Sequence, residues 1–263
     1  MKRVVISLLL LALTASLFVG CGKKSDNLNS LESVKKSGKL LIGLEDSYPP
    51  MEFRNSKNDL VGFDIELGNE IAKKLGVKSE YVTTDFNGII LALNASRFNI
   101  ILSGMSITDK RKAAIDFSVP YVTGGQIIAV KSGDSSITSV DNLKGKIVGT
   151  QLGSIGDTTA SAMKDLKEVK KYDKIAEALQ ELSSGRVNAV IMDAQVGGYY
   201  TTQKPGEYKI LNKYVSEEPM GIGFTKGDKE LKVAIDKAIL ELKSDGTLTK
   251  LSIKWFGFNA YKK

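Results

Sequence analysis

Two segments of the chain place polar residues directly after a short apolar run that is typical of a buried strand. The run at 99–102 (Asn-Ile-Ile-Leu) leads into Ser103 and Arg111, and the run at 189–192 (Ala-Val-Ile-Met) leads into Asp193. In a sheet of parallel strands, ligands bind beyond the carboxyl ends of the strands. A guanidinium at such a place can bind a carboxylate through two parallel hydrogen bonds, although an arginine considered alone is as often a surface residue.

The residues that are missing exclude several kinds of chemistry. The chain has no histidine, which excludes Ser-His-Asp and Cys-His catalysis and every metal site that needs histidine. Its single cysteine, Cys21, also excludes a disulfide framework and a cysteine cluster for zinc or iron–sulfur. We therefore expect no metal and no cofactor.

The two polar segments belong to an internal repeat. Residues 93–102 (LNASRFNIIL) match residues 182–191 (LSSGRVNAVI) at one constant offset, and 38–43 (GKLLIG) resembles 145–149 (GKIVG). Each half would then run strand, loop, helix and a later helix-turn-strand. Two such halves facing each other would place the two polar segments across one cleft. The alternative is that short helix-turn-strand units look alike by chance.

The elements that would position these segments alternate between strands and helices. Strands are predicted at 39–43, 80–84, 99–102, 146–149, near Val169 and at 189–192. Helices are predicted at 64–75 with Asp64 as N-cap and Gly76 closing it, at 87–96, at 176–182, and from Lys229 with a break at Gly246. This alternation favours parallel sheets with crossover helices, hence an α/β fold. With 263 residues, the chain suits one large domain or two smaller ones.

The N-terminus is typical of an export signal. Lys2 and Arg3 precede an apolar run at 4–19 that ends in Gly20 and Cys21. At 1.5 Å per residue, this run spans roughly 24 Å, short for a hydrocarbon core of about 30 Å. We expect residues 1–20 to be a signal peptide that is removed, and the rest to be extracytoplasmic.

The junction at Cys21 resembles the lipobox of bacterial lipoproteins, whose cysteine is lipid-modified and becomes the first residue. Phe18 departs from the usual aliphatic residue of that motif. We expect a lipidated Cys21 that binds the bilayer, with 21–35 as a flexible tether. The alternative is an ordinary signal peptide with an incidental cysteine.

The charge of the chain argues against one class of partner. The formal net charge is +7, and the excess is lysine-rich and spread along the sequence. Such a distribution is usually a solvated surface, so we expect no binding of nucleic acid.

Five motifs in one order carry a family resemblance. They are VGFDIEL at 61–67, GMSITDKR at 104–111, DFSVPY at 116–121, NLKGKIVG at 142–149 and LKSDGTL at 242–248. Together they resemble the extracellular solute-binding protein family 3, the polar amino-acid receptors of ABC importers. The resemblance runs from about Lys39 to Gly257.

The resemblance implies a fold and a set of partners. It implies a two-lobed α/β fold of the periplasmic-binding-protein type II, with two crossover strands and a ligand cleft between the lobes. Lobe 1 would comprise 36–124 and 223–263, and lobe 2 would comprise 125–222. The partners would be a free amino acid and an ABC permease in the membrane, and the protein would be a monomer.

The resemblance also implies a site for the α-carboxylate and α-ammonium groups of an amino acid. Arg111 and Ser106 would bind the carboxylate, and the start of a helix at Gly153 and Ser154 would face the same group. The ammonium would be accepted by a second set of residues, Asp193, Ser103 and Gly104. Alternatively, Asp193 could serve as a helix N-cap, and the serines could be simple turn residues.

Three further residues would form the pocket for the side chain of the ligand. Tyr48 and Phe86 match family positions where aromatic rings flank the ligand side chain, although core packing would also account for them. Glu45 matches a position where receptors for basic amino acids often carry an acid, and the alternative is a solvated loop carboxylate. Cation–π contacts and this acid favour arginine or lysine, ahead of glutamine.

Three departures from the family pattern stand out. Asn99 and Asn188 replace the usual Asp after a turn, where we expect a structural role. Ile155 and Gly156 replace hydroxyl and amide residues, which removes polar side-chain contacts from lobe 2 and leaves the identity of the ligand open.

The expected function is binding without covalent chemistry, in which closure of the two lobes on an amino acid is read by a permease. Two other classes remain open. One is a sensory protein that signals through a membrane partner. The other is an enzyme similar to a periplasmic cyclohexadienyl dehydratase, for which Glu45 or Asp193 would have to act as general acid.

Overall fold

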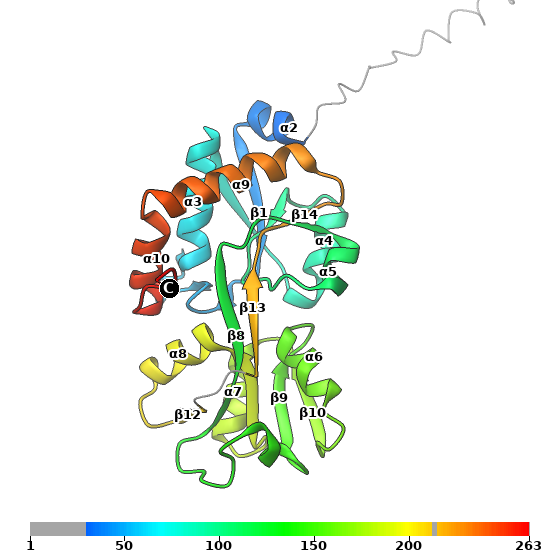
Figure 1. The fold of residues 1–263 in the computed structure, drawn as a ribbon, viewed down its shortest axis with the longest axis vertical. Helices are drawn as coiled ribbons and strands as arrows, with labels where there is room; N and C mark the ends of the chain where they lie inside the picture. The colour runs from blue at the N-terminus through cyan, green and yellow to red at the C-terminus, as the bar shows by residue number, and fades with distance from the viewer. Residues whose placement is uncertain (1–29, 212–214, 263) are drawn as a thin grey trace, which may run out of the picture.

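The structure, a computed structural model, describes residues 30–211 and 215–262. Figure 1 shows two lobes joined near the middle of the molecule by two long strands. Each lobe is built around its own mixed sheet with helices packed against it. The expected two-lobed α/β fold is confirmed.

Lobe 1 contains a five-stranded sheet in the order β5-β1-β6-β14-β7. Its strands are β1 (Lys39–Leu44), β5 (Lys78–Thr83), β6 (Ile100–Ile101), β7 (Asp116–Phe117) and β14 (Gly223–Phe224). A second, three-stranded sheet lies beside it, made of β2 (Ser47–Tyr48), β3 (Glu52–Arg54) and β4 (Leu60–Val61). The helices are α2 (Ser30–Ser37), α3 (Phe63–Leu75), η2 (Phe86–Gly88), α4 (Ile89–Asn94), α5 (Asp109–Ala114), α9 (Lys229–Ser244) and α10 (Thr247–Phe256).

Lobe 2 contains the sheet β10-β9-β11-β8-β12, with β13 also paired to β8. Its strands are β8 (Val122–Lys131), β9 (Ile147–Gln151), β10 (Glu168–Tyr172), β11 (Ala189–Asp193), β12 (Tyr208–Ile210) and β13 (Ser216–Met220). Its helices are η3 (Val140–Leu143), α6 (Ile155–Ala162), α7 (Ile175–Ser183) and α8 (Ala194–Gln203).

The strands β8 and β13 carry the chain between the lobes. They run antiparallel, with Gln126 opposite Ser216 and Val122 opposite Met220. The expected lobe boundary after residue 124 lies within β8, and the one after residue 222 lies directly before β14. Two paired strands form a narrow connection about which the lobes can bend.

The sheets are mixed, whereas the alternation of elements predicted parallel sheets. The pairs β1–β5, β1–β6, β9–β10 and β9–β11 are parallel, but β14 is antiparallel to β6 and β8 is antiparallel to β11. The difference arises because β8 and β14 reach their sheets from the other lobe. They therefore need no crossover helix and can run in the opposite direction.

The helix α3 has the predicted apolar stripe but a different start. Leu67 and Ile71 are fully buried, and Gly76 closes the helix in the left-handed conformation, as predicted. The predicted N-cap, Asp64, is wrong, because the helix begins at Phe63 and Gly62 occupies the capping position. A side chain at Gly62 would collide with the carbonyl oxygen of Met51, so the glycine is sterically required. The Asp64 carboxylate is used inside the lobe instead.

Part of the segment expected to be a flexible tether, residues 21–35, is helical in the structure. Residues 30–37 form α2, whose Val34 is buried against the lobe and whose partner is α9. Residues 30–35, expected to belong to a flexible tether, are therefore helical, because Val34 gains apolar burial in the lobe. The predicted signal peptide and Cys21 lie outside the described residues. Within those that are described, no helix is both long and apolar enough to span a bilayer.

The internal repeat corresponds to one structural device in each lobe. Asn99 Oδ1 accepts the backbone N–H of Leu41 at 2.8 Å, and Asn188 Oδ1 accepts that of Ile147 at 2.9 Å. Each asparagine thus ties the turn before the last strand of the repeat to the start of the first strand. The predicted structural role of both residues is confirmed.

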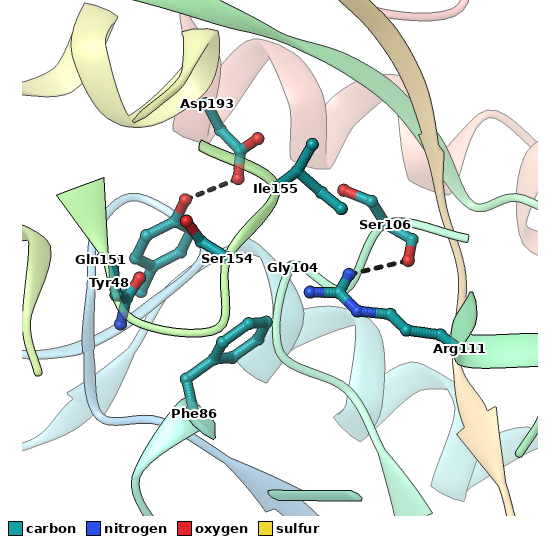
Figure 2. A pocket seen from close by; sticks show the side chains of 9 residues that line it. All are labelled: Tyr48, Phe86, Gly104, Ser106, Arg111, Gln151, Ser154, Ile155 and Asp193. Atoms are coloured by element: carbon teal, nitrogen blue, oxygen red, sulfur yellow. Dashed lines mark hydrogen bonds between the residues drawn. The ribbon is translucent and has the colours of Figure 1, made fainter. Parts of the chain in front are cut away.

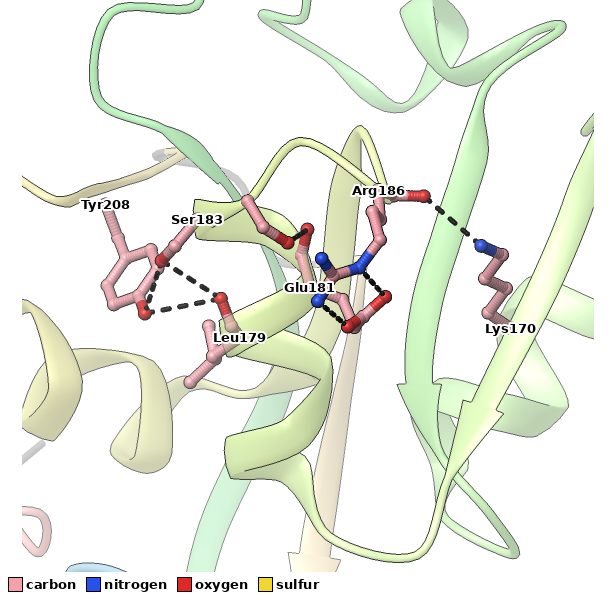
Figure 3. Close-up of polar contacts among 7 residues, drawn as sticks. Lys170, Leu179, Glu181, Ser183, Arg186 and Tyr208 are labelled. Carbon is pink, nitrogen blue, oxygen red and sulfur yellow. Dashed lines mark hydrogen bonds and ion pairs between the residues drawn. The ribbon is translucent and has the colours of Figure 1, made fainter.

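The corresponding turn in lobe 2 has additional polar contacts, drawn in Figure 3. Arg186 Nε donates to Glu181 Oε2 at 2.7 Å, and Ser183 Oγ lies 3.0 Å from Tyr208 Oη. The Tyr208 hydroxyl lies 3.3 Å from the carbonyl oxygen of Leu179. These contacts fasten β12 and the turn before β11 to α7, which fixes the strand that ends in Asp193.

Candidate functional site

A small cavity lies between the lobes at the carboxyl ends of their parallel strands (Figure 2). It has a volume of about 10 Å³, close to the minimum that holds one water molecule. Nine residues line it: Tyr48, Phe86, Gly104, Ser106 and Arg111 from lobe 1, and Gln151, Ser154, Ile155 and Asp193 from lobe 2. Seven of them are among the ten residues that the sequence suggested.

Arg111 extends its guanidinium across the gap between the lobes. Its backbone N–H donates to Thr108 Oγ1, the N-cap of α5, at 3.2 Å. Its Nη1 donates to the carbonyl oxygen of Ser106 at 2.8 Å, and its Nη2 donates to that of Gly153, in lobe 2, at 3.1 Å. Its Cζ lies 5.4 Å from the centre of the Phe86 ring.

The surroundings of Arg111 suit an anion. Burial lowers the pKa of the guanidinium, while the charges of Asp193 and Glu218 raise it. Among the described residues, no carboxylate forms an ion pair with Arg111, whose guanidinium contacts two carbonyl oxygens and a ring. A cation removed from water without a counter-ion is costly, so an incoming carboxylate would be strongly favoured here.

Asp193 supplies the opposite charge from the other lobe. It ends β11 at the N-cap position of α8, but its side chain forms no capping hydrogen bond. Its Oδ2 instead accepts the hydroxyl of Tyr48 at 2.5 Å, and its Oδ1 accepts Gln126 Nε2. Burial raises the pKa of this carboxyl to about 6, whereas the hydrogen bonds from Tyr48 and Gln126 lower it. Asp193 is therefore mostly ionised at neutral pH and can accept a cation.

The turn at 103–104 is held from inside lobe 1. Ser103 Oγ donates to Glu52 Oε1 at 2.6 Å and accepts the backbone N–H of Glu45 at 3.0 Å. The backbone N–H of Gly104 donates to Asp64 Oδ2 at 2.7 Å. Gly104 lines the cavity and Ser103 does not, so the hydroxyl of Ser103 serves the turn itself.

Glu45 lies directly behind the cavity wall. It is 4% exposed, and its carboxylate accepts hydrogen bonds from Ser47 Oγ and from Gln151 Nε2, each at 2.6 Å. Burial raises the pKa of this carboxyl above its usual value. The residue that lines the cavity here is Gln151, in lobe 2, whose Nε2 also donates to the carbonyl oxygen of Asp173 at 3.1 Å.

Sequence reasoning missed Gln151, although a signal was available. Gln151 is the last residue of β9, as Asp193 is the last residue of the neighbouring parallel strand β11. The rule that ligands bind at the carboxyl ends of parallel strands applies equally to both. The strand predicted at 146–149 ends two residues too early, so Gln151 falls in the loop of that prediction.

The start of α6 forms the lobe-2 side of the cavity. Ser154 is its N-cap, and its Oγ accepts the backbone N–H of Asp157 at 3.0 Å. The backbone N–H of Gly153 was expected to face the ligand, but it donates to Asp157 Oδ2 at 3.1 Å. A Cβ on Gly156 would lie 2.5 Å from the carbonyl oxygen of Ile191. The close packing of α6 on β11 thus explains why this position lacks a side chain.

The structure therefore brings seven predicted residues to one cavity and places Glu45, Ser103 and Gly153 around it. Within residues 30–211 and 215–262, no cluster of three or more metal-ligating side chains is found. The resulting arrangement offers a cation from lobe 1, an anion from lobe 2 and two aromatic rings. That set of groups matches a small zwitterion.

Comparison with known proteins places this geometry in context. A sequence profile of the bacterial extracellular solute-binding proteins, family 3, matches residues 40–258. The arginine-binding extracellular protein ArtP of Bacillus subtilis (strain 168) is 37% identical over 97% of this chain and 98% of its own. The L-cystine-binding protein TcyJ of Escherichia coli (strain K12) is 33% identical over 88% of each chain. The solved structure of an ancestral arginine-binding protein bound to arginine is 46% identical, with a TM-score of 0.80, over 84% of this chain and 99% of that one.

Proposed function

The chain belongs to the bacterial extracellular solute-binding proteins, family 3, and from that premise we propose that it binds a free polar amino acid between its lobes. The observation that carries the proposal is that Arg111 of lobe 1 and Asp193 of lobe 2 line the same cavity. An amino acid carries a carboxylate and an ammonium on one carbon. A closed site must pair both groups, because a buried unpaired charge is very costly.

The proposed binding mode follows from the charges of these two residues and from the hydrogen bonds that a ligand would replace. The carboxylate takes the place of the Ser106 and Gly153 carbonyl oxygens at the Arg111 guanidinium and binds it bidentately. The ammonium is accepted by Asp193 together with the backbone of the turn at 103–104. A ligand held this way contacts both lobes.

Entry of the ligand requires the lobes to separate. A cavity of about 10 Å³ cannot hold an amino acid. The lobes are joined by the two strands β8 and β13, so bending there would open the cleft without disrupting either core. An amino acid that contacts both lobes then shifts the population toward the closed form. We propose that a membrane permease of an ABC importer recognises that closed form.

For the identity of the ligand we propose arginine or lysine, followed by glutamine. Phe86 already lies against a guanidinium, that of Arg111, and Tyr48 faces the same cavity. The Glu45 carboxylate lies behind Gln151 and adds negative charge near the far end of the cavity. The relatives named for arginine support this order, while the one named for L-cystine keeps a larger, doubly zwitterionic ligand in the test.

We also propose an extracytoplasmic location with a lipid anchor at Cys21 and a monomeric state. The support for the anchor is the sequence around the junction at 17–21. The lobe boundaries proposed after residues 124 and 222 lie at the crossover strands, where a hinge would act. The relatives described above are named as binding proteins, which supports binding without turnover.

The test is thermal unfolding of residues 22–263 against each of the twenty amino acids and L-cystine, after unfolding and refolding to remove carried-over ligand. A ligand at 100 times its dissociation constant adds about 2.7 kcal/mol, which moves the midpoint by several degrees. A shift with arginine or lysine supports the proposal, and a shift with glutamine or cystine changes its ligand. If none of them shifts the midpoint, the amino-acid receptor assignment is wrong.

A further inference from the structure

Two fully buried carboxyl groups lie beneath the turn at 103–104, and the binding mode does not use them. Glu52 belongs to β3 and Asp64 is the second residue of α3, and both side chains are 0% exposed. The backbone N–H of Asp64 donates to the carbonyl oxygen of Met51 at 2.8 Å, which holds the two elements together. Carboxyl groups so deep in a lobe require partners.

One oxygen of each carboxyl holds the turn. Glu52 Oε1 accepts the hydroxyl of Ser103, and Asp64 Oδ2 accepts both the backbone N–H of Gly104 and, at 3.1 Å, the hydroxyl of Tyr121. These contacts fix two successive residues of the turn. Gly104 itself is in the left-handed conformation, with φ of 53°, and lines the cavity.

The other oxygen of each carboxyl has no donor in the part of the chain that the structure describes. These two atoms are Glu52 Oε2 and Asp64 Oδ1, and both are buried. Burial is the main reason why the pKa of Asp64 rises to about 7 and why that of Glu52 rises well above its usual value, with the charge of Asp64 as the next cause for Glu52. Two carboxyl groups that cannot both ionise retain a proton at neutral pH.

The described groups that face this pair carry no positive charge. The charged and titratable residues that act on Glu52 and Asp64, or are affected by them, are Glu45, Tyr48, Tyr81, Tyr121 and Tyr261. No described lysine or arginine forms an ion pair with either carboxyl. A proton is therefore the available means of reducing the repulsion between them.

We propose that Glu52 and Asp64 hold one proton between Glu52 Oε2 and Asp64 Oδ1, and that this bridge fixes the 103–104 turn for binding the ligand's ammonium group. The inference rests on the proposed function for its binding part only. Glu52 and Asp64 are then positioning residues, because they act through Ser103 and Gly104 and do not contact the ligand. Preorganised acceptors bind more tightly, since less ordering remains to be done on binding.

The test compares two substitutions of one residue. Glu52→Gln keeps an oxygen for the Ser103 hydroxyl and places an amide N–H where the shared proton would lie. Glu52→Leu has a similar volume and provides neither group. In calorimetric titrations with L-arginine at pH 7, we expect Glu52→Gln to stay within about threefold of the unmodified protein. We expect Glu52→Leu to bind about tenfold more weakly or worse, because it leaves buried partners unpaired.

The pH dependence of folding gives a readout that needs no ligand. A raised carboxyl pKa means that the folded state binds more protons than the unfolded state, so stability falls as pH rises toward the folded pKa. Glu52→Gln removes one such group. Between pH 5 and 8, the unfolding equilibrium constant of the unmodified protein should rise relative to that of Glu52→Gln by up to tenfold per pH unit.

The amide proton of Gly104 reports on the turn directly. By NMR in the ligand-free protein, its hydrogen exchange should be slow in the unmodified protein and in Glu52→Gln, and faster in Glu52→Leu. If arginine binds neither the unmodified protein nor the variants, arginine is not the ligand, and this readout still decides the bridge. The bridge is overturned if Glu52→Gln exchanges or binds like Glu52→Leu, or if its stability has the same pH dependence as the unmodified protein.

Discussion

The hydroxyl group of Tyr48 in lobe 1 donates a hydrogen bond to Asp193 Oδ2 in lobe 2, across 2.5 Å. Between described residues, two more hydrogen bonds cross the cleft, from Arg111 Nη2 to Gly153 and from Gln151 Nε2 to Glu45. In each of these three hydrogen bonds, a residue that lines the cavity is bound to the opposite lobe. The residues that bind the ligand therefore also hold the lobes together.

Arg111→Ala should abolish binding of arginine. The substitution removes the partner of the carboxylate, and unpairing a buried charge costs about 2–5 kcal/mol. Calorimetric titration measures the loss. The control is Arg97→Ala, which removes an exposed arginine in the turn before β6 and should leave the dissociation constant unchanged. Tight binding by Arg111→Ala would show that the carboxylate is bound elsewhere.

Acid should weaken arginine binding through Asp193. Its pKa of about 6 means that the carboxyl protonates below that pH and can no longer pair with an ammonium. The dissociation constant should rise about tenfold per pH unit below pH 6. Asp193→Asn should bind arginine about 2–5 kcal/mol more weakly than the unmodified protein, and its dissociation constant should not change with pH in this range. If Asp193→Asn still lost affinity below pH 6, the pH dependence would belong to another group.

The same raised pKa has the opposite sign for the stability of the ligand-free protein. Because the folded state binds the proton of Asp193 more tightly than the unfolded state, its contribution to stability increases as pH falls from about 6 toward 4. Urea unfolding without ligand should show this gain relative to Asp193→Asn. Acid thus favours the folded protein at this residue while it weakens the complex.

Glu45→Gln should distinguish cationic from neutral ligands. The buried carboxylate lies behind Gln151, so its charge acts on the ligand's far end without lining the cavity. We expect the dissociation constant for arginine to rise about tenfold, as for loss of a partly desolvated charge pair, and that for glutamine to change by less than about threefold. Equal effects on both ligands would limit Glu45 to a structural role.

Trp255 should report closure of the lobes. It is the only tryptophan of the chain, and its ring centre lies 6.1 Å from that of Phe53, which lies 5.5 Å from that of Tyr199 in lobe 2. Opening would separate Phe53 from Tyr199 and change the surroundings of the indole. We expect arginine to change the tryptophan emission at concentrations that match the calorimetric dissociation constant.

Tyr199→Ala should weaken arginine binding although Tyr199 does not line the cavity. It removes an aromatic contact of about 0.5–1.5 kcal/mol from the closed form, which corresponds to roughly twofold to tenfold in affinity. The control is Phe258→Ala, an exposed ring that packs on Phe256 within lobe 1. Unchanged affinity in Tyr199→Ala would mean that this contact persists in the open form.

The sequence by itself determined many of the elements and the repeat. Local apolar periodicity predicted the strands β1, β5, β6, β9, β10 and β11 and the helices α3, α4, α7 and α9 to within a few residues. It placed Leu67 and Ile71 on the buried face of α3, but it did not predict β8 and β13, which carry the chain between the lobes. The repeat predicted that Asn99 and Asn188 are equivalent, since each follows the same helix-turn pattern. The position of Arg111 and Asp193 after buried strands followed from the same local signals, because strand ends are fixed by neighbours in sequence.

The tertiary structure alone decided how distant residues meet. The mixed sheets depend on crossover strands that return from the other lobe. The partners of Asp64 are Gly104, after β6, and Tyr121, directly before β8, and both are far along the chain. Whether Gln151 or Glu45 lines the cavity depends on how the two lobes close. Sequence periodicity carries no information on such contacts, because it reports which face is buried and not what that face is buried against.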